Sequence, residues 1–295
     1  MTSERRMPSL VSTEWLSAEL GSAGLRVLDA SWYLPSMDRD AEAEYLAGHL
    51  PGAVFFDLDS SSDTTSPLPH MLPDPQVFAA RMSALGIADG DRIVVYDGSG
   101  VNLSAPRAWW MFRVFGHAEV AVLDGGIGKW RSEGRPLERG RPEPQPARFS
   151  AALDPSRVRD RAAVIGNLAS GREQVVDMRS RGRFEGRDPE PRPGIRGGHI
   201  PGSRSLPFTD LVAADGTMLP PAELRRRLAE AGIDPARPVI ASCGSGTTAC
   251  ALVLALDVLG ATQAAVYDGS WTEWGGATET PVDTGPSDRV PPAAN

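Results

Sequence analysis

The chain has 295 residues, of which 41% are hydrophobic and 23% charged, and its formal net charge is −8 at pH 7. This length is about twice that of a usual single domain, so we expect two compact units with separate cores. The acidic balance excludes a broad surface for nucleic acid or an anionic membrane, but a local cluster of arginines still allows an anionic ligand.

Cysteine and histidine content narrows the class of protein further. Cys243 and Cys250 are the only cysteines, too few for a disulfide framework. Four scattered histidines lack metal-ligand spacing and no cofactor motif is present, so we expect no metal and no organic cofactor. The first residues lack the apolar core of a signal peptide, and Asp257 interrupts the most apolar stretch. We therefore expect a soluble, unsecreted protein in a reducing cytoplasm.

Strand-like and turn-like segments alternate along the first half of the chain. They are "LRVLDAS" (25–31), "AGHLPGAVFFD" (47–57), "DRIVVYDGSG" (91–100) and "VFGHAEVAVLDGGIGKW" (114–130). Short β-branched runs bounded by turn residues predict strands, and the longer segments between them predict helices.

The second half repeats the same plan in the same order. "QVVDMRS" (174–180), "GGHIPGSRSLPF" (197–208), "RPVIASCGSG" (237–246) and "VLGATQAAVYDGSWTEW" (258–274) match the four segments above. A duplicated domain explains these ordered matches. The alternation of strands and helices predicts an α/β protein in which each copy is a parallel sheet with helices on both faces.

Composition suggests where the copies begin and end. The stretch 131–150 is rich in Pro, Arg and Gly and has no apolar periodicity, which is typical of a linker. We expect a first domain over 9–140, a linker over 141–156, a second domain over 157–280 and a flexible tail over 281–295.

Cys243 occupies the Gly-rich turn of the second copy. At the end of a parallel strand, such a turn aims several backbone N–H groups and the positive end of a helix dipole at one point, which stabilises a thiolate. The alternative, a small buried hydrophobe, suits Cys250 inside the apolar run. In the first copy the matching position is Asp97, in a turn that is two residues longer, so that copy has lost the nucleophile.

These features together resemble the tandem-domain rhodanese superfamily and, within it, the branch that uses 3-mercaptopyruvate. The resemblance rests on the repeat and on an ordered series of motifs that spans about residues 9 to 280. They are "DASWYLP", "SPLPHMLP", "SAPRAWWMFRVFGH", "GRFEGRDPEPRPG", "GHIPGS", "CGSG" and "YDGSWTEW". The resemblance implies a sulfurtransferase that moves the sulfur of 3-mercaptopyruvate through a Cys243 persulfide to a thiol, thioredoxin or cyanide and releases pyruvate.

An arginine-rich segment, 179–196, follows the first strand of the second copy. It holds six arginines against three acids, and a planar guanidinium grips a carboxylate in two bonds. The resemblance implies that Arg183 and Arg192 hold the carboxylate and keto oxygens of the substrate; the alternative is a solvated loop. The other arginines of the segment we interpret as surface residues: Arg179, Arg181, Arg187 and Arg196.

The resemblance also implies further catalytic groups. His70 and Asp59 of the first domain would join Ser245 in a serine–histidine–aspartate relay, whereas a surface histidine and a loop cap are the structural alternatives, and Asp57 competes for the aspartate role. Backbone groups of the turn would bind substrate and persulfide: Gly244, Gly246, Thr247 and Thr248. His49 and His199 recur at equivalent places in both copies, so we interpret them as structural. Four tryptophans we interpret as aromatic residues of the cores and of the domain interface: Trp109, Trp110, Trp271 and Trp274.

Three other functions fit these residues less well. A cysteine phosphatase needs an arginine six residues after the cysteine, where this chain has Ala249. Thiosulfate sulfurtransferases carry basic residues just after the cysteine, where Gly244 and Ser245 are neutral, so thiosulfate stays as an alternative donor. A non-catalytic rhodanese-like interaction module would have no use for both Cys243 and the arginines.

Overall fold

The computed structural model describes residues 7–287 and divides into two compact units. The first comprises residues 7–155 together with 212–218, and the second comprises 156–211 and 219–287. The excursion of 212–218 into the first unit is fixed by polar contacts: Asn102 Nδ2 donates to the Gly216 carbonyl (3.1 Å) and the Met218 N–H donates to Asp124 Oδ1 (2.7 Å). Neither contact is evident from composition.

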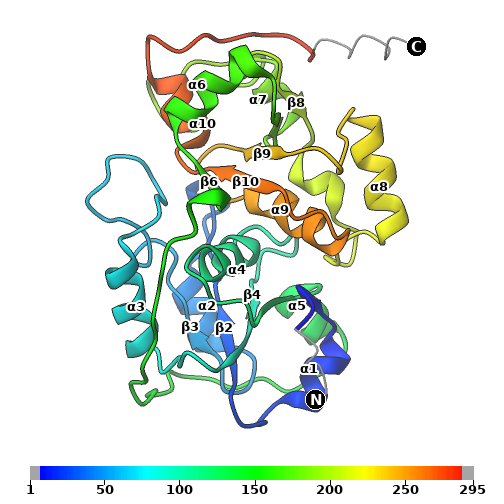
Figure 1. Ribbon diagram of the computed structural model, residues 1–295. Coiled ribbons are helices and arrows are strands. Elements are labelled where there is room, and N and C mark those ends of the chain that lie inside the picture. Colours follow the sequence, from blue (N-terminus) through cyan, green and yellow to red (C-terminus); the bar gives the residue numbers. More distant parts are fainter. Residues whose placement is uncertain (1–6, 288–295) are drawn as a thin grey trace, which may run out of the picture. The chain divides into compact units, whose positions relative to one another are not determined.

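The first unit is a five-stranded parallel sheet with helices (Figure 1). Its sheet order is β1-β5-β4-β2-β3. The elements are β1 (Leu10–Val11), α1 (Thr13–Glu19), β2 (Leu25–Asp29), a 3-10 turn (Pro35–Met37), α2 (Ala41–Ala47), β3 (Val54–Phe55), α3 (Pro75–Ala84), β4 (Arg92–Tyr96), α4 (Ala105–Val114), β5 (Val120–Leu123) and α5 (Gly126–Ser132).

The second unit has the same topology, β6-β10-β9-β7-β8, again all parallel. Its elements are a 3-10 turn (Pro155–Arg157), β6 (Val158–Arg159), α6 (Arg161–Ser170), β7 (Gln174–Asp177), α7 (Arg181–Phe184), β8 (Arg204–Ser205), a 3-10 turn (Phe208–Leu211), α8 (Pro221–Glu230), β9 (Val239–Ser242), α9 (Ala249–Val258), β10 (Ala264–Tyr267) and α10 (Ser270–Gly276). The duplication and the α/β class expected from the sequence are confirmed.

Strand register aligns the two copies residue by residue. Asp29 of β2 pairs with Tyr96 of β4, and Asp177 of β7 pairs with Ser242 of β9. The next residues, Asp97 and Cys243, therefore occupy equivalent positions at the carboxyl ends of equivalent strands. The turn over 97–104 is two residues longer than the turn over 243–248, as the sequence indicates.

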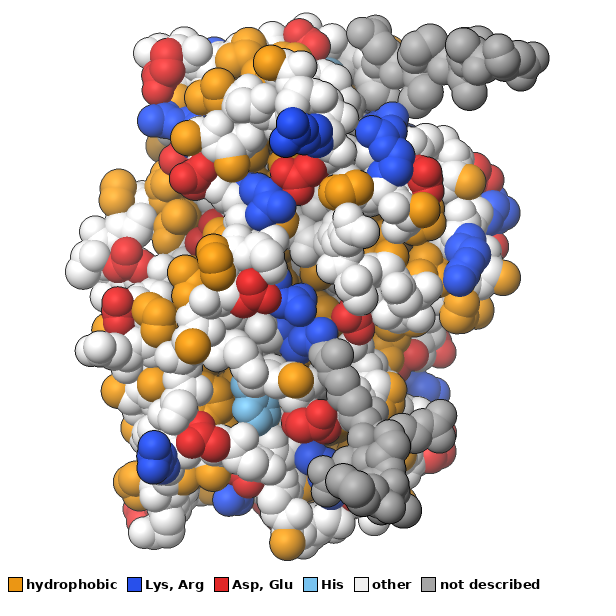
Figure 2. Space-filling model, viewed as in Figure 1, with side chains coloured by type: hydrophobic (Ala, Val, Ile, Leu, Met, Phe, Trp, Pro, Cys, Tyr) orange, Lys and Arg blue, Asp and Glu red, His pale blue; other side chains and the backbone are white. Residues whose placement is uncertain are grey.

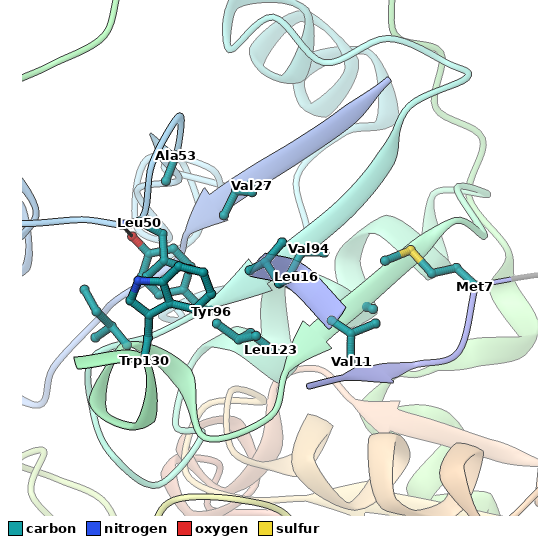
Figure 3. Close-up of a cluster of buried hydrophobic side chains, with 12 residues drawn as sticks. Met7, Val11, Leu16, Val27, Leu50, Ala53, Val94, Tyr96, Leu123 and Trp130 are labelled. Carbon is teal, nitrogen blue, oxygen red and sulfur yellow. Dashed lines mark hydrogen bonds between the residues drawn. The ribbon is translucent and has the colours of Figure 1, made fainter. Parts of the chain in front are cut away.

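Each unit has its own apolar core. In the first unit, Figure 3 shows Trp130 and Tyr96 at one end of a buried cluster and Met7 and Val11 at the other. The second unit buries a smaller cluster that includes Tyr267, Trp271 and Trp274. Trp109 and Trp110 are also buried, as the sequence predicts for aromatic residues of a core. No helix among residues 7–287 combines the length and apolarity needed to span a membrane.

Residues 141–154, most of the expected linker, form no helix or strand, but they lie against the first unit. The Ala147 N–H donates to the Ser83 carbonyl (2.9 Å), and Phe149 is buried with its ring 6.0 Å from that of Phe78. Asp154 is held in the same way by the Val114 carbonyl (2.7 Å). One buried aromatic ring and several backbone hydrogen bonds hold this segment. Neither leaves a periodic pattern of apolar residues in the sequence, so the sequence does not predict the packing.

Residues 281–285 are ordered backbone, in contrast to the flexible tail that composition predicts. Asp283 and His199 exchange two backbone hydrogen bonds (2.8 and 3.0 Å), and the Pro281 carbonyl accepts from Trp274 Nε1 (2.8 Å). Residues 288–295 of that predicted tail lie outside the described residues. Figure 2 shows acidic and basic side chains interspersed over one face of the molecule.

Candidate active site

Cys243 is the first residue after β9 and lies in the turn that leads into α9. Its side chain is buried, with 1% of the residue exposed. Gly246 takes a φ of 76° in the turn, a left-handed conformation that costs glycine nothing. The ten residues of α9 begin at Ala249, so the positive end of the helix dipole faces the turn that holds the thiol.

Residues of α10 and the turn before it hold the Cys243 turn in place. The Cys243 N–H donates to Ser270 Oγ (3.1 Å), and its carbonyl accepts from the Trp271 N–H (3.0 Å). The Gly244 carbonyl accepts from both the N–H (2.9 Å) and the hydroxyl (2.6 Å) of Thr272. Ser270 and Thr272 belong to the repeated "DGSWTEW" motif, but no role follows from the sequence because their partners lie 27 to 28 residues earlier.

The other turn residues flank the thiol closely in sequence. Ser245 and Thr247 are buried, whereas Gly244 and Thr248 are partly exposed. Cys250 is fully buried in the first turn of α9, and its Sγ donates to the Gly246 carbonyl (3.3 Å). Because the Cys250 side chain is buried and its thiol bonds back to the turn before α9, its geometry fits the structural role expected for it.

Arg183 of α7 approaches the cysteine turn. A Cβ placed on Gly244 would lie 3.2 Å from Arg183 Nη2, so the guanidinium passes directly beside the residue that follows Cys243. Glu190 pairs with Arg183 at 2.5 Å. Arg192 lies on the same segment and is partly exposed; its role in binding the substrate stays a prediction.

The interpretation of the remaining arginines as surface residues is wrong for Arg179, which is buried, whereas Arg196 is partly exposed. Arg179 is 2% exposed, forms ion pairs with Asp177 (2.6 Å) and Glu190 (2.7 Å), and stacks on Trp271. Arg196 donates to carbonyls at the end of α10, among them Gly275 (3.1 Å). Guanidinium groups with five donors can be buried when carboxylates and helix carbonyls receive them. The side chains of Arg181 and Arg187 are 62% and 64% exposed, as expected.

His70 and Asp59 are brought together in the first unit. His70 Nε2 lies 3.1 Å from Asp59 Oδ1, and Trp32 Nε1 donates to Asp59 Oδ2 (3.2 Å) while its ring packs edge-on against the imidazole. The His70 side chain is 4% exposed and that of Asp59 is 66% exposed. His70 has a φ of 61°, and the buried Arg107 donates to its carbonyl.

The contacts of Asp57 and Asp59 differ, and only Asp59 is found beside the His70 ring. Asp57 instead accepts from the Ser60 hydroxyl and lies 3.8 Å from Arg81. Asp59 is thus the aspartate that contacts the His70 ring, and its role in orienting that ring stays a prediction. His70 and Asp59 belong to the first unit and Ser245 to the second, so the complete relay is a proposal.

His49 and His199 have structural surroundings in both copies. Each is buried and directs Nδ1 to a backbone carbonyl, of Tyr45 (2.8 Å) and Phe184 (2.9 Å) respectively, while its ring stacks on the ring of that same residue. The matching geometry supports the structural interpretation of both histidines. Among residues 7–287, no group of His, Cys, Asp and Glu side chains is arranged to bind a metal ion.

The equivalent turn of the first unit serves a different purpose. Asp97 accepts from the backbone N–H groups of Ser104 (3.0 Å) and Ala105 (2.9 Å), and so caps α4 with its carboxylate. A carboxylate that satisfies helix N–H groups stabilises the fold. The structure thus defines a duplicated α/β protein in which only the second turn carries a cysteine.

Comparison with known proteins places this class within a family. A model of the rhodanese-like domain matches residues 12–133 and 160–277. The chain belongs to the rhodanese family.

Individual relatives cover almost the whole chain. It is 46% identical over 279 residues to 3-mercaptopyruvate sulfurtransferase of Rattus norvegicus (93% of this chain, 94% of that protein). It is 45% identical over 290 residues to thiosulfate sulfurtransferase of Cricetulus griseus (96% and 97%). The crystal structure of SseA from Escherichia coli, titled as a 3-mercaptopyruvate sulfotransferase, superposes with a TM-score of 0.82 at 39% identity, covering 90% of this chain and 99% of that one.

Proposed function

We propose that this protein is a sulfurtransferase that takes the sulfur of 3-mercaptopyruvate onto Cys243 and passes it to an acceptor. The observation that carries the proposal is the Arg183 guanidinium beside Gly244, next to a buried cysteine at the amino end of α9. A cation at this distance suits a donor whose carboxylate is a few atoms from the sulfur to be attacked. The 46% identity to a 3-mercaptopyruvate sulfurtransferase supports the same donor.

The arginine-rich segment, 179–196, binds the substrate. Arg183 and Arg192 hold the carboxylate and keto oxygens of 3-mercaptopyruvate through charge-assisted hydrogen bonds. Backbone N–H groups of Gly244, Gly246, Thr247 and Thr248 stabilise negative charge on the reacting sulfur.

Sulfur transfer to the enzyme is a displacement at sulfur. The Cys243 thiolate attacks the terminal sulfur of the substrate, an S–S bond forms, and the C–S bond breaks. The electron pair of the broken bond leaves with the carbon as the enolate of pyruvate, which then takes up a proton. The product on the enzyme is a Cys243 persulfide.

Proton transfer is assigned to the His70–Asp59 pair and Ser245. Asp59 orients the imidazole, the imidazole supplies a proton to the enolate, and the Ser245 hydroxyl hydrogen-bonds the substrate. The 3.1 Å contact between His70 and Asp59 supports the first of these roles. In the second half-reaction, a thiol, reduced thioredoxin or cyanide attacks the outer sulfur and regenerates the Cys243 thiolate.

Thiosulfate is the second candidate donor. The 45% identity to a thiosulfate sulfurtransferase favours it almost as strongly as the other relative favours 3-mercaptopyruvate. The neutral residues Gly244 and Ser245 argue for 3-mercaptopyruvate, because a dianionic donor gains more from cations next to the nucleophile.

The test is a parallel assay of pyruvate release from 3-mercaptopyruvate and sulfite release from thiosulfate, with mass spectrometry of the protein after each donor. We expect pyruvate release to dominate and one extra sulfur to be found on Cys243. Cys243→Ser abolishes transfer, whereas the matched control Cys250→Ser largely retains it because Cys250 lies inside α9 and its thiol donates to the Gly246 carbonyl. A fully active Cys243→Ser variant would overturn the mechanism.

We also propose that the protein works in the cytoplasm. Both cysteines are free thiols, which suits a reducing compartment. A related Arabidopsis thaliana sulfurtransferase, 43% identical, is named as mitochondrial, so cell fractionation with an antibody against the chain is the deciding measurement.

A further inference from the structure

Glu190 is a buried acid that the mechanism above does not use. Its side chain is 4% exposed and lies between two guanidinium groups. Oε1 accepts from Arg179 Nη1 (2.7 Å) and from Arg183 Nε (3.2 Å), and Oε2 accepts from Arg183 Nη2 (2.5 Å). One carboxylate thus connects a fully buried arginine to the arginine beside the cysteine turn.

Arg179 gives Glu190 a rigid support. Its guanidinium is bonded along one edge to Asp177, donates to the Gly198 carbonyl (2.6 Å) and stacks on Trp271 at 4.3 Å. Burial acts to lower the pKa of Arg179, but the charges and hydrogen bonds of Asp177 and Glu190 outweigh it and raise the pKa, so this arginine stays charged. A carboxylate held by such a group has little freedom to move.

The contacts of Glu190 also decide which edge of Arg183 meets a substrate. Glu190 occupies Nε and Nη2, the same Nη2 that approaches Gly244. Within the described part of the chain, residues 7–287, no partner of Arg183 Nη1 is found. The edge that carries Nη1 is therefore the one offered to a ligand at the Cys243 turn.

The formal charges have a second consequence. Asp177 pairs with Arg179 and Glu190 pairs with Arg183, so these four side chains carry no net formal charge. Without Glu190, Arg183 would bring an uncompensated positive charge beside the Cys243 turn. Such a charge favours a dianionic donor more than a monoanionic one, because the Coulomb energy grows with the charge of the ligand.

We propose that Glu190 is a positioning and specificity-determining residue, which orients Arg183 beside Cys243 and keeps the site selective for a monoanionic sulfur donor over a dianionic one. This inference rests on the proposed function. It assigns the selectivity to a residue that touches Arg183 and not the substrate.

The experiment compares kcat and KM for 3-mercaptopyruvate and thiosulfate in the wild-type protein and in Glu190→Gln, which keeps the shape and removes the charge. We expect the ratio of kcat/KM for 3-mercaptopyruvate to that for thiosulfate to fall at least fivefold, mainly through KM. The matched control is Glu173→Gln. Glu173 pairs with Arg159 (2.8 Å) just before β7, at the end of the strands opposite to Cys243, and its loss leaves the ratio unchanged.

Two further variants separate a role through Arg183 from a structural role. In an Arg183→Ala background, adding Glu190→Gln changes the ratio less than twofold, because the residue on which Glu190 acts is gone. Glu190→Asp keeps the charge but shortens the reach, so KM rises for both donors with little change in their ratio; this variant decides the question if Glu190→Gln does not fold.

Different results would overturn the role of Glu190 and the proposed function. An unchanged ratio in folded Glu190→Gln, the same change in the Arg183→Ala background, or unchanged KM values in Glu190→Asp would overturn the role of Glu190 and leave the proposed function standing. A wild-type protein that forms no Cys243 persulfide from either donor would overturn both.

Discussion

At the scale of single residues, Arg183 and Arg192 carry the proposed recognition of the donor's carboxylate. Arg183→Ala and Arg192→Ala should each lower kcat/KM for 3-mercaptopyruvate by several-fold to about a hundredfold. A hydrogen bond to a charged group contributes about 1.5–3 kcal/mol, and about 1.4 kcal/mol corresponds to a factor of ten. Steady-state kinetics measure the loss. Arg187→Ala, which removes an exposed pair with Glu185, is the control; unchanged kinetics in both test variants would show that the carboxylate binds elsewhere.

The two residues after the cysteine set the local charge of the turn. Gly244→Arg combined with Ser245→Lys should shift preference towards thiosulfate and lower turnover of 3-mercaptopyruvate, because cations beside the nucleophile favour a dianionic donor. A side chain at position 244 starts only 3.2 Å from Arg183 Nη2 and also repels that guanidinium.

Ser245→Lys alone is the milder control, because it adds charge without crowding Arg183. Both efficiencies are measured side by side on the folded variants. If their ratio does not move towards thiosulfate, the charge of the turn does not determine the donor, and the assignment depends on the arginines.

At the scale of elements, α10 fixes the geometry of the turn between β9 and α9. Thr272→Val removes the hydroxyl that donates to the Gly244 carbonyl and keeps the backbone bond to the same oxygen. One neutral hydrogen bond contributes about 1 kcal/mol, so we expect kcat to fall about two- to tenfold with little change in thermal stability. Thr272→Ser restores the hydroxyl and should recover most of the activity; a Thr272→Ser variant as weak as Thr272→Val would argue against this bond.

At the scale of the whole molecule, the free energy of unfolding depends on pH through buried titratable groups such as His117. Burial lowers the pKa of His117 below its ordinary value of 6.5, and its Nε2–H donates to the Asp91 carbonyl (2.9 Å). The unfolded chain therefore binds a proton at a higher pH than the folded protein does. The stability that depends on neutral His117 is fully present above pH 6.5 and is lost as the pH falls through the lowered pKa.

Urea unfolding of the wild-type protein and His117→Gln at pH 7.5, 6.5 and 5.5 measures this effect. We expect the free energy of unfolding of the wild-type protein to decline on acidification more steeply than that of the variant, which cannot take up this proton. Parallel pH slopes in the two proteins would contradict the assignment to His117.

Much of the candidate site was predictable because its residues are local in sequence. Cys243 and its turn follow a short apolar strand and precede an apolar helix, so the chain order alone places the thiol at a helix amino end. Ser270, Thr272 and Glu190 were not predictable, because their roles arise from hydrogen bonds to residues distant in sequence or from burial between two arginines.

The sequence by itself determined the duplication, the parallel α/β class and the family, because apolar periodicity, turn residues and repeated motifs are properties of contiguous segments. Only the tertiary structure decided which charges are buried. Arg179 has the same composition around it as Arg181, yet the first is enclosed by Asp177, Glu190 and Trp271 and the second is exposed. The physical reason is that a buried charge is stable only with partners placed in three dimensions, and partner placement depends on how strands and helices pack.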